Sequence, residues 1–198
     1  MSAAARLAPA VALVLALSGC GSSPPTHYYE LMPVPASSTC PAPAAKPVVV
    51  RQVAMPPALD RSGIVSEEGG GRVVVSDQDR WVAPLDGQIR SVMTANLRQR
   101  LGDAAVLAPG DPVPPGGVES IAITVQRLLA DASGRVTLAA DFALVPPNRP
   151  AGLAQHVRLV LDAGSARAEA VVPVMSAALG RLADRIAGTI SPGCTRGG

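Results

Sequence analysis

The sequence predicts an α+β fold in which two amphipathic helices pack on one face of a largely antiparallel sheet. Three observations lead to this class: short runs rich in Val, Ile and Leu, two stretches with helical spacing of apolar residues, and Gly or Pro clusters of turn length between them. With 198 residues, 48% of them hydrophobic and 16% charged, the chain is long and apolar enough to bury the core of one domain.

The first twenty residues indicate export and lipid attachment. Arg6 precedes an apolar run over 7–17, which is shorter than the roughly 20 residues of a membrane-spanning helix and typical of a signal peptide. The run ends in Leu17-Ser18-Gly19-Cys20, which resembles the lipobox of bacterial lipoproteins. That resemblance implies a signal peptide over 1–19 and acylation of Cys20 by fatty acids such as palmitate.

The segment after Cys20 is expected to be a lipid-anchored tether. No Asp follows Cys20, and by resemblance to lipoprotein sorting in Gram-negative bacteria this favours the periplasmic face of the outer membrane. Seven of the 20 prolines lie between 21 and 47, which predicts a semi-rigid Pro-rich tether over 20–46 and a single domain over 47–198. The patch from Tyr28 to Leu31 is expected to dock as a short strand or to be held by a partner.

Six runs of the domain are predicted to be strands, and they span 48–54, 72–76, 118–129, 135–145, 157–162 and 166–172. The third and fourth runs alternate apolar and polar residues, so one face of the sheet should be buried. The turn from Asp131 to Gly134 predicts that these two runs form an antiparallel hairpin. Gly69-Gly70-Gly71 lacks the Gly-Lys-Ser/Thr of a phosphate loop, which favours a hairpin loop.

Two helices are predicted, over 86–101 and 173–190. We expect Asp86 to cap the first helix after Pro84, and Gly102 to end it. The second begins at Pro173 and stops before Pro192. Each helix has an apolar stripe that requires a surface, and the one-sided sheet provides it.

The sequence contains no pattern typical of catalysis, metal binding or nucleic-acid binding. It has two histidines and no nucleophile elbow. Asp77-Gln78-Asp79 is interpreted as a solvated turn, because the further spaced ligands of a calcium loop are missing. Glu67-Glu68 is interpreted as loop charge, because nothing indicates a cleft or a partner carboxylate. A net charge of +2 with 2% aromatic residues offers little to neutralise phosphates or stack on bases. We therefore expect no enzyme activity, cofactor, metal or nucleic-acid partner.

Cys40 and Cys194 are the two cysteines that remain after lipidation. The periplasm permits disulfides, and a bridge between them would close a loop of about 155 residues and stabilise the fold by ~2–4 kcal/mol. Two free thiols and intermolecular pairing are the alternatives. Trp81, the only tryptophan, is interpreted as a core residue that covers the start of the first helix, with a partner contact as the alternative.

The order of several short motifs resembles that of the PqiC/YmbA family, the auxiliary lipoproteins of ABC-type transport systems with MCE proteins. After the lipobox come Tyr28-Tyr29 and Leu31, then Met55-Pro56, Leu59-Asp60-Arg61 and Ile64-Val65, then Trp81, Pro84-Leu85, Asn96-Leu97 and Leu101. The motifs cover residues 28–101, and the rest of the chain agrees in the order of its elements.

The resemblance implies a non-enzymatic lipoprotein that works with an MCE-domain tunnel protein and an inner-membrane component to move lipids between membranes and to preserve envelope integrity. It also implies that a homo-oligomer can form around the tunnel end. The carried-over positions are structural signatures first and partner contacts second; they are Tyr28, Tyr29, Leu31, Asp60, Arg61, Trp81, Pro84 and Leu85. The alternative is a lipoprotein that itself binds a lipid or small apolar ligand, for which an apolar cavity is required.

Overall fold

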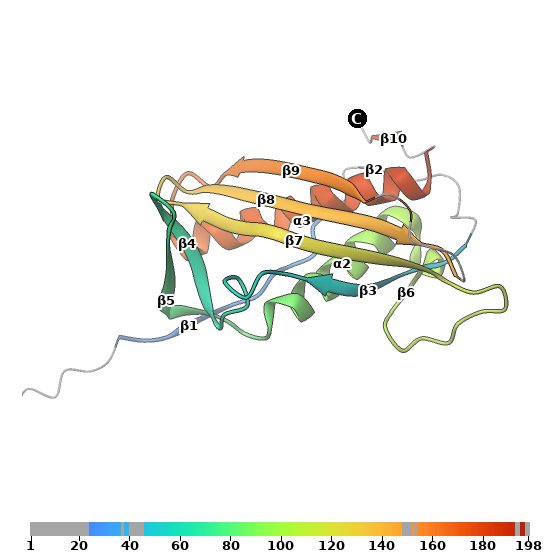
Figure 1. Cartoon of the computed structure of the whole chain (residues 1–198), viewed down its shortest axis with the longest axis horizontal. Coiled ribbons are helices and arrows are strands. Elements are labelled where there is room, and N and C mark those ends of the chain that lie inside the picture. Colours follow the sequence, from blue (N-terminus) through green and yellow to red (C-terminus); the bar gives the residue numbers. More distant parts are fainter. Residues whose placement is uncertain are drawn as a thin grey trace, which may run out of the picture.

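A computed structural model describes residues 24–36, 38–39, 46–147, 152, 154–192 and 195–196. Its main body is one sheet with two long helices on one face (Figure 1). The helices are α2 (Leu85–Leu101) and α3 (Ala168–Ile190), with a short 3₁₀ helix η1 (Asp103–Ala105) after α2. The predicted α+β class is confirmed.

The sheet has eight strands: β1 (His27–Tyr29), β3 (Val48–Ala54), β4 (Gly63–Gly69), β5 (Arg72–Trp81), β6 (Val106–Leu107), β7 (Glu119–Asp131), β8 (Arg135–Val145) and β9 (Gln155–Asp162). The long strand β7 has β8 along one side. Its other side pairs with β3 near its start and with β4 near its end. A separate two-stranded sheet joins β2 (Ser38–Thr39) to β10 (Thr195–Arg196).

The sheet is mixed. The long pairs β4–β5, β7–β8 and β8–β9 are antiparallel, whereas β1–β5, β3–β6, β3–β7 and β4–β7 are parallel. Parallel pairing of β3 with β7 requires a crossover, and the chain between them contains α2. The predicted hairpin of β7 and β8 is confirmed: the Gly134 amide donates to the Asp131 carbonyl at 2.9 Å, and Gly134 has φ +85°.

The core lies between the sheet and the two helices (Figure 1). On β8, Val136, Leu138 and Ala140 are fully buried, as the predicted alternation requires. Leu179 and Leu182 of α3 are also fully buried. The apolar stripes of the predicted helices therefore face the sheet, as expected.

One predicted strand is wrong, because residues 166–172 are largely the first turn and a half of α3. Val171 and Val172 gave the segment a β-rich composition, but both are buried with the core in the helix. Pro173 is exposed inside α3. Its ring removes the hydrogen bond to the carbonyl of Glu169, and this loss is tolerable on a solvent-facing side of a helix. Tertiary burial therefore outweighed local propensity.

Three smaller predictions are also corrected. Asp77-Gln78-Asp79 lies inside β5 and is not a turn. Glu67 and Glu68 belong to β4, a strand absent from the prediction, and not to a loop. Pro84 occupies the N-cap of α2, and Asp86 lies in the first turn without capping it.

Candidate functional site

The N-terminal segment docks on the domain. β1 runs parallel to the end of β5, with Tyr28 beside Arg80 and Tyr29 beside Trp81. The Val82 amide extends this pairing by donating to the Tyr29 carbonyl at 3.0 Å. The expectation of a short docked strand here is confirmed. The tether as a whole stays a prediction, but its described residues from His27 onward lie against the domain.

The chain then continues as a strap, which we define as residues 30–36. Two side chains of α2 accept hydrogen bonds from its backbone. The Leu31 amide donates to Gln88 Oε1 at 2.9 Å, and the Val34 amide donates to Asn96 Oδ1 at 2.9 Å. Both helix side chains are buried. The strap therefore satisfies its backbone donors through side chains where no strand lies beside it.

Helix α3 holds the strap from the other side. The Met32 amide donates to Ser176 Oγ at 3.1 Å. A Cβ atom placed on Gly180 would lie 2.2 Å from Val34 Cγ2, so the strap passes too close to α3 for any larger residue. The absence of a side chain at Gly180 is what allows this approach.

A buried arginine joins the two helices near the strap. The Arg100 side chain is 1% exposed and its Nε donates to Asp184 Oδ1 at 2.5 Å. Its two terminal nitrogens donate to the carbonyls of Asn96 and Gly180 at 2.8 and 3.0 Å. The guanidinium is thus paired and hydrogen-bonded in the way a buried charge requires.

The polar residues of α2 that hold the strap or join the two helices were not identified from the sequence alone. The available signal was polar residues at positions near the apolar stripe of α2, namely Gln88, Asn96 and Arg100. Polar residues at such positions can bind a docked segment, but they are equally typical of the solvent-facing border of an amphipathic helix. Only the docked strap distinguishes the two interpretations.

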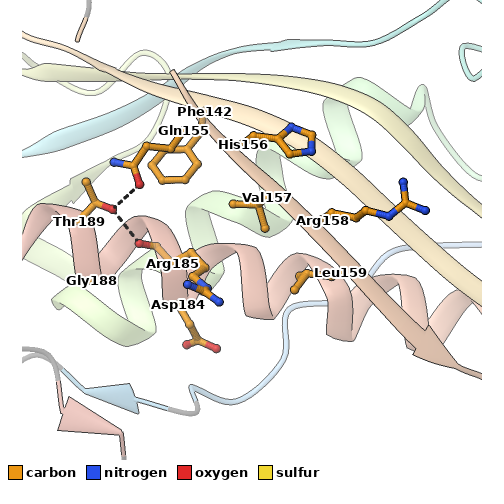
Figure 2. A pocket seen from close by; sticks show the side chains of 10 residues that line it. All are labelled: Phe142, Gln155, His156, Val157, Arg158, Leu159, Asp184, Arg185, Gly188 and Thr189. Carbon is orange, nitrogen blue, oxygen red and sulfur yellow. Dashed lines mark hydrogen bonds between the residues drawn. The ribbon is translucent and has the colours of Figure 1, made fainter. Parts of the chain in front are cut away.

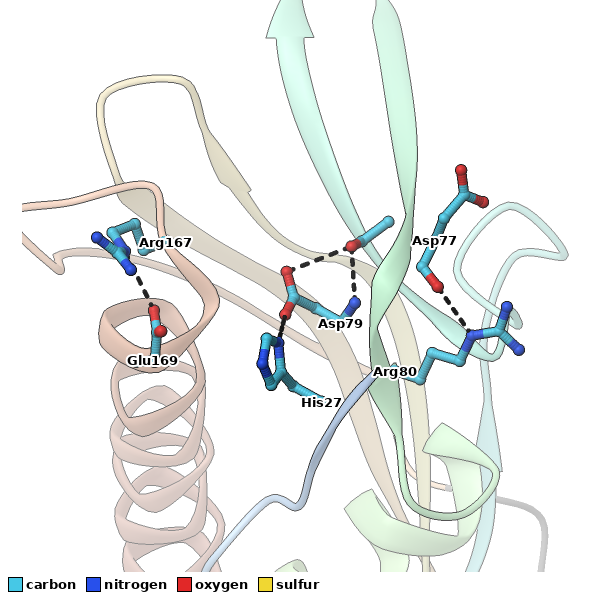
Figure 3. Close-up of polar contacts among 7 residues, drawn as sticks. His27, Asp77, Asp79, Arg80, Arg167 and Glu169 are labelled. Carbon is cyan, nitrogen blue, oxygen red and sulfur yellow. Dashed lines mark hydrogen bonds and ion pairs between the residues drawn. The ribbon is translucent and has the colours of Figure 1, made fainter. Parts of the chain in front are cut away.

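A polar cluster lies where β1 meets β5 (Figure 3). His27 Nδ1 and Asp79 Oδ1 are 3.3 Å apart, and the Asp79 amide donates to Ser76 Oγ at 2.9 Å. Burial raises the pKa of Tyr29, and the carboxylates of Asp79 and Glu169 raise it further. The described residues contain no group of three or more side chains suited to hold a metal ion.

The predicted signature residues fall into two groups. Leu31, Trp81 and Leu85 are buried at 2%, 6% and 3% exposure, so the interpretation of Trp81 as a core residue is confirmed. Pro84 precedes α2, and Tyr29 is half-buried. The exposed members are Tyr28, Asp60, Arg61 and Pro84. Asp60 and Arg61 lie in a turn in which the Arg61 amide donates to the Leu59 carbonyl at 2.9 Å.

The three cysteines, Cys20, Cys40 and Cys194, lie outside the described residues. Acylation of Cys20 and pairing of the other two therefore stay predictions. None of the helices in the described ranges is sufficiently long and apolar to cross a bilayer.

A groove of about 510 Å³ lies between β9 and the C-terminal part of α3 (Figure 2). Thr189 Oγ1 donates to the Arg185 carbonyl at 3.0 Å at one end. Six of the ten lining residues are polar, so the groove lacks the apolar wall that a lipid chain requires. The lining residues are Phe142, Gln155, His156, Val157, Arg158, Leu159, Asp184, Arg185, Gly188 and Thr189.

Comparisons with known proteins identify the family to which this chain belongs. The chain matches the family described as "ABC-type transport auxiliary lipoprotein component" over residues 29–187. It is similar to the intermembrane transport lipoprotein PqiC of Escherichia coli K12 and to that of Shigella flexneri. Each is 27% identical over 131 residues, which cover 65% of this chain and 68% of the relative.

Two solved structures share the fold. One, of an uncharacterized protein, has a TM-score of 0.69 and 20% identity, and the match covers 85% of this chain and 100% of that one. The other, from Xanthomonas campestris, has a TM-score of 0.68 and 18% identity, with 83% and 95% covered. At these identities the likeness concerns the fold alone.

Proposed function

Because the chain belongs to the family of ABC-type transport auxiliary lipoprotein components, we propose that it is a non-enzymatic subunit of an intermembrane lipid transport system. It is anchored by acylated Cys20 to the periplasmic face of the outer membrane and helps to maintain envelope integrity. The observation that carries the proposal is the family match over 29–187, which begins within β1 and includes the strap and both helices.

The proposed partners are an MCE-domain tunnel protein and an inner-membrane transport component. The curated relatives are named intermembrane transport lipoproteins, which supports a transport system as the setting. The exposed signature residues are available as contacts, and they are Tyr28, Asp60, Arg61 and Pro84. The alternative of a protein that binds lipid by itself gains no support from the polar groove beside β9.

Affinity purification of the acylated chain from detergent-solubilised envelopes tests this function. Mass spectrometry should identify an MCE-domain protein and an inner-membrane permease in the eluate. The double variant Asp60→Ala/Arg61→Ala should stay folded, since both side chains are exposed. The amount of transport partner in its eluate, compared with wild type, tests whether this turn contacts the partner. An acylated wild-type chain that elutes without any transport component would contradict the proposal.

We further propose that Cys40 and Cys194 form an intramolecular disulfide. Thr39 pairs directly with Thr195, and Ser38 pairs with Arg196, in an antiparallel register. Thr39 and Thr195 are the sequence neighbours of the two cysteines, and their pairing supports the proposed bridge. Thiol counting on the purified mature chain should find neither cysteine free, and reduction should lower its melting temperature. Two reactive thiols in the native protein would exclude the bridge.

A further inference from the structure

We propose that the β4–β5 hairpin, residues 63–81, lies on the lipid surface of the membrane that holds the anchor. The inference rests on acylation of Cys20, which is part of the proposed function. It adds an orientation: one end of the domain contacts lipid headgroups, and the domain does not stand away from the bilayer.

Exposed apolar side chains gather at this end of the molecule. Of the eight large hydrophobic residues exposed in the described part of the chain, five lie in or directly beside β1 and β5, and a sixth, Met32, lies in the strap that follows β1. Their exposures are 65% for Tyr28, 57% for Met32, 48% for Val73, 37% for Val74, 43% for Val75 and 55% for Val82. Such a concentration marks a contact surface, because scattered single residues are the ordinary pattern.

Strand β5 is an edge of the main sheet over much of its length. β4 pairs with β7 through Ser66 and Glu67, and β1 covers β5 only at residues 79–81. Val73 to Val75 therefore have β4 on one side and no strand on the other within the described sheet. Figure 1 shows β4, β5 and β1 together at one end of the molecule.

The hairpin tip is open. Gly69, Gly70 and Gly71 all have positive φ, and a Cβ atom at any of them would meet no atom within 4 Å. The tip therefore presents backbone and no side chains, and it can approach a headgroup layer closely.

The length of chain before β1 limits the distance to the membrane. Six residues separate Cys20 from His27, so seven Cα–Cα steps place the acylated residue at most about 25 Å from the start of β1. β5 has ten residues and is about 33 Å long. The chain between Cys20 and His27 is thus shorter than β5. The anchor therefore keeps this end of the domain close to the headgroups.

The charges of the hairpin indicate an apolar contact. Glu68 pairs with Arg72, and Glu67 pairs with Arg127 of β7. Asp79 faces His27. The hairpin also carries exposed Asp77 and Arg80, and Arg80 Nε donates to the Asp77 carbonyl. With four acidic and two basic residues, the hairpin offers no basic cluster to anionic lipid, so added salt should not weaken its binding.

A fluorescent probe at position 74 tests the inference. The acylated mature chain carries Val74→Cys in a Cys40→Ser/Cys194→Ser background, labelled with NBD and reconstituted in phosphatidylethanolamine/phosphatidylglycerol vesicles. The control is Val113→Cys, a valine that is 58% exposed against 37% for Val74 and that lies in the loop between β6 and β7 at the opposite end (Figure 1). Circular dichroism melting checks that both labelled chains are folded.

Emission at position 74 should shift to the blue and be quenched by spin-labelled lipid, whereas the probe at position 113 should show neither effect. Vesicles that float with the protein while both probes behave as in water would overturn this inference and leave the anchor intact. Protein that does not float at all would contradict acylation, and with it the proposed function. Energy transfer between probes at position 74 on different copies, without lipid quenching, would assign the surface to a second copy and overturn the lipid contact.

Discussion

Trp81 connects three parts of the molecule. It is the last residue of β5, it pairs with Tyr29 of β1, and its amide donates to the Ser62 carbonyl at 2.8 Å. Its side chain is in the main core. The residue therefore contributes both to the docking of the N-terminal segment and to the core.

Replacing Trp81 with Ala should destabilise the fold by ~3–5 kcal/mol, because a large buried aromatic side chain is removed. Val82→Ala is the control: Val82 is exposed, and its loss should change stability by no more than about 0.5 kcal/mol. Chemical denaturation followed by circular dichroism measures both. A Trp81→Ala chain with wild-type stability that has lost partner binding would identify the residue as a contact and not as part of the core.

The Asp131 turn gives a pH-dependent prediction. Asp131 Oδ1 accepts from Ser133 Oγ at 2.5 Å and from the Arg135 amide at 3.0 Å. These bonds lower the pKa of Asp131 below its ordinary 3.8. The ionised carboxylate therefore stabilises the fold above the ordinary value, and this contribution is lost as the pH falls through the lowered one.

Asp131→Ala should consequently melt below wild type at neutral pH, and the gap should narrow in acid below pH 3.8. Melting temperatures at a series of pH values measure the gap. A constant difference across the series would mean that packing of the turn, and not the ionised carboxylate, accounts for the effect.

At the level of elements, the strap and α3 depend on each other at one contact. Gly180→Ala places a methyl group against Val34 and should cost about 1–3 kcal/mol through overpacking. Val34→Ala removes the opposing methyl groups. The double variant should therefore recover part of the loss, with a coupling of at least about 0.5 kcal/mol.

Denaturation of the two single variants and the double variant completes this cycle. Gly188→Ala is the matched control on the same helix, because a Cβ there meets no atom within 4 Å. Additive effects of Gly180→Ala and Val34→Ala would mean that the strap does not lie against α3.

Local periodicity predicted the elements whose partners are near in sequence. The stripe from Ile89 to Leu101 and the alternation along β8 each identify an element and its buried face. The turn at Gly134 then joins β7 to β8 correctly. In these cases the local pattern and the tertiary packing require the same conformation.

The features that the sequence did not predict depend on contacts between residues that are distant in the chain. Val171 and Val172 favour a strand in isolation, but the core holds them in a helix. Asp79 resembles a turn residue until His27 is placed beside it by the parallel β1. The bonds of Gln88 and Asn96 to the strap join residues 57 and 62 positions apart, so no local pattern encodes them.

For the whole molecule, the docked N-terminal segment would connect the proposed anchor at Cys20 to the domain. β1 and the strap cross from the hairpin end along both helices, so residues 27–36 are part of the folded structure. In the proposed account, acylation at Cys20 consequently sets both the membrane and the orientation of the domain. A long free linker would allow neither.

Mass spectrometry of the N-terminal peptide of the protein purified from membranes tests this account most directly. The account predicts a mature chain that begins at Cys20 and carries acyl chains on that residue. Cys20→Ala should yield an uncleaved precursor without fatty acid, because both processing steps require the thiol. A wild-type chain without fatty acid, or a Cys20→Ala chain that still carries it, would contradict the anchor and the membrane-bound function built on it.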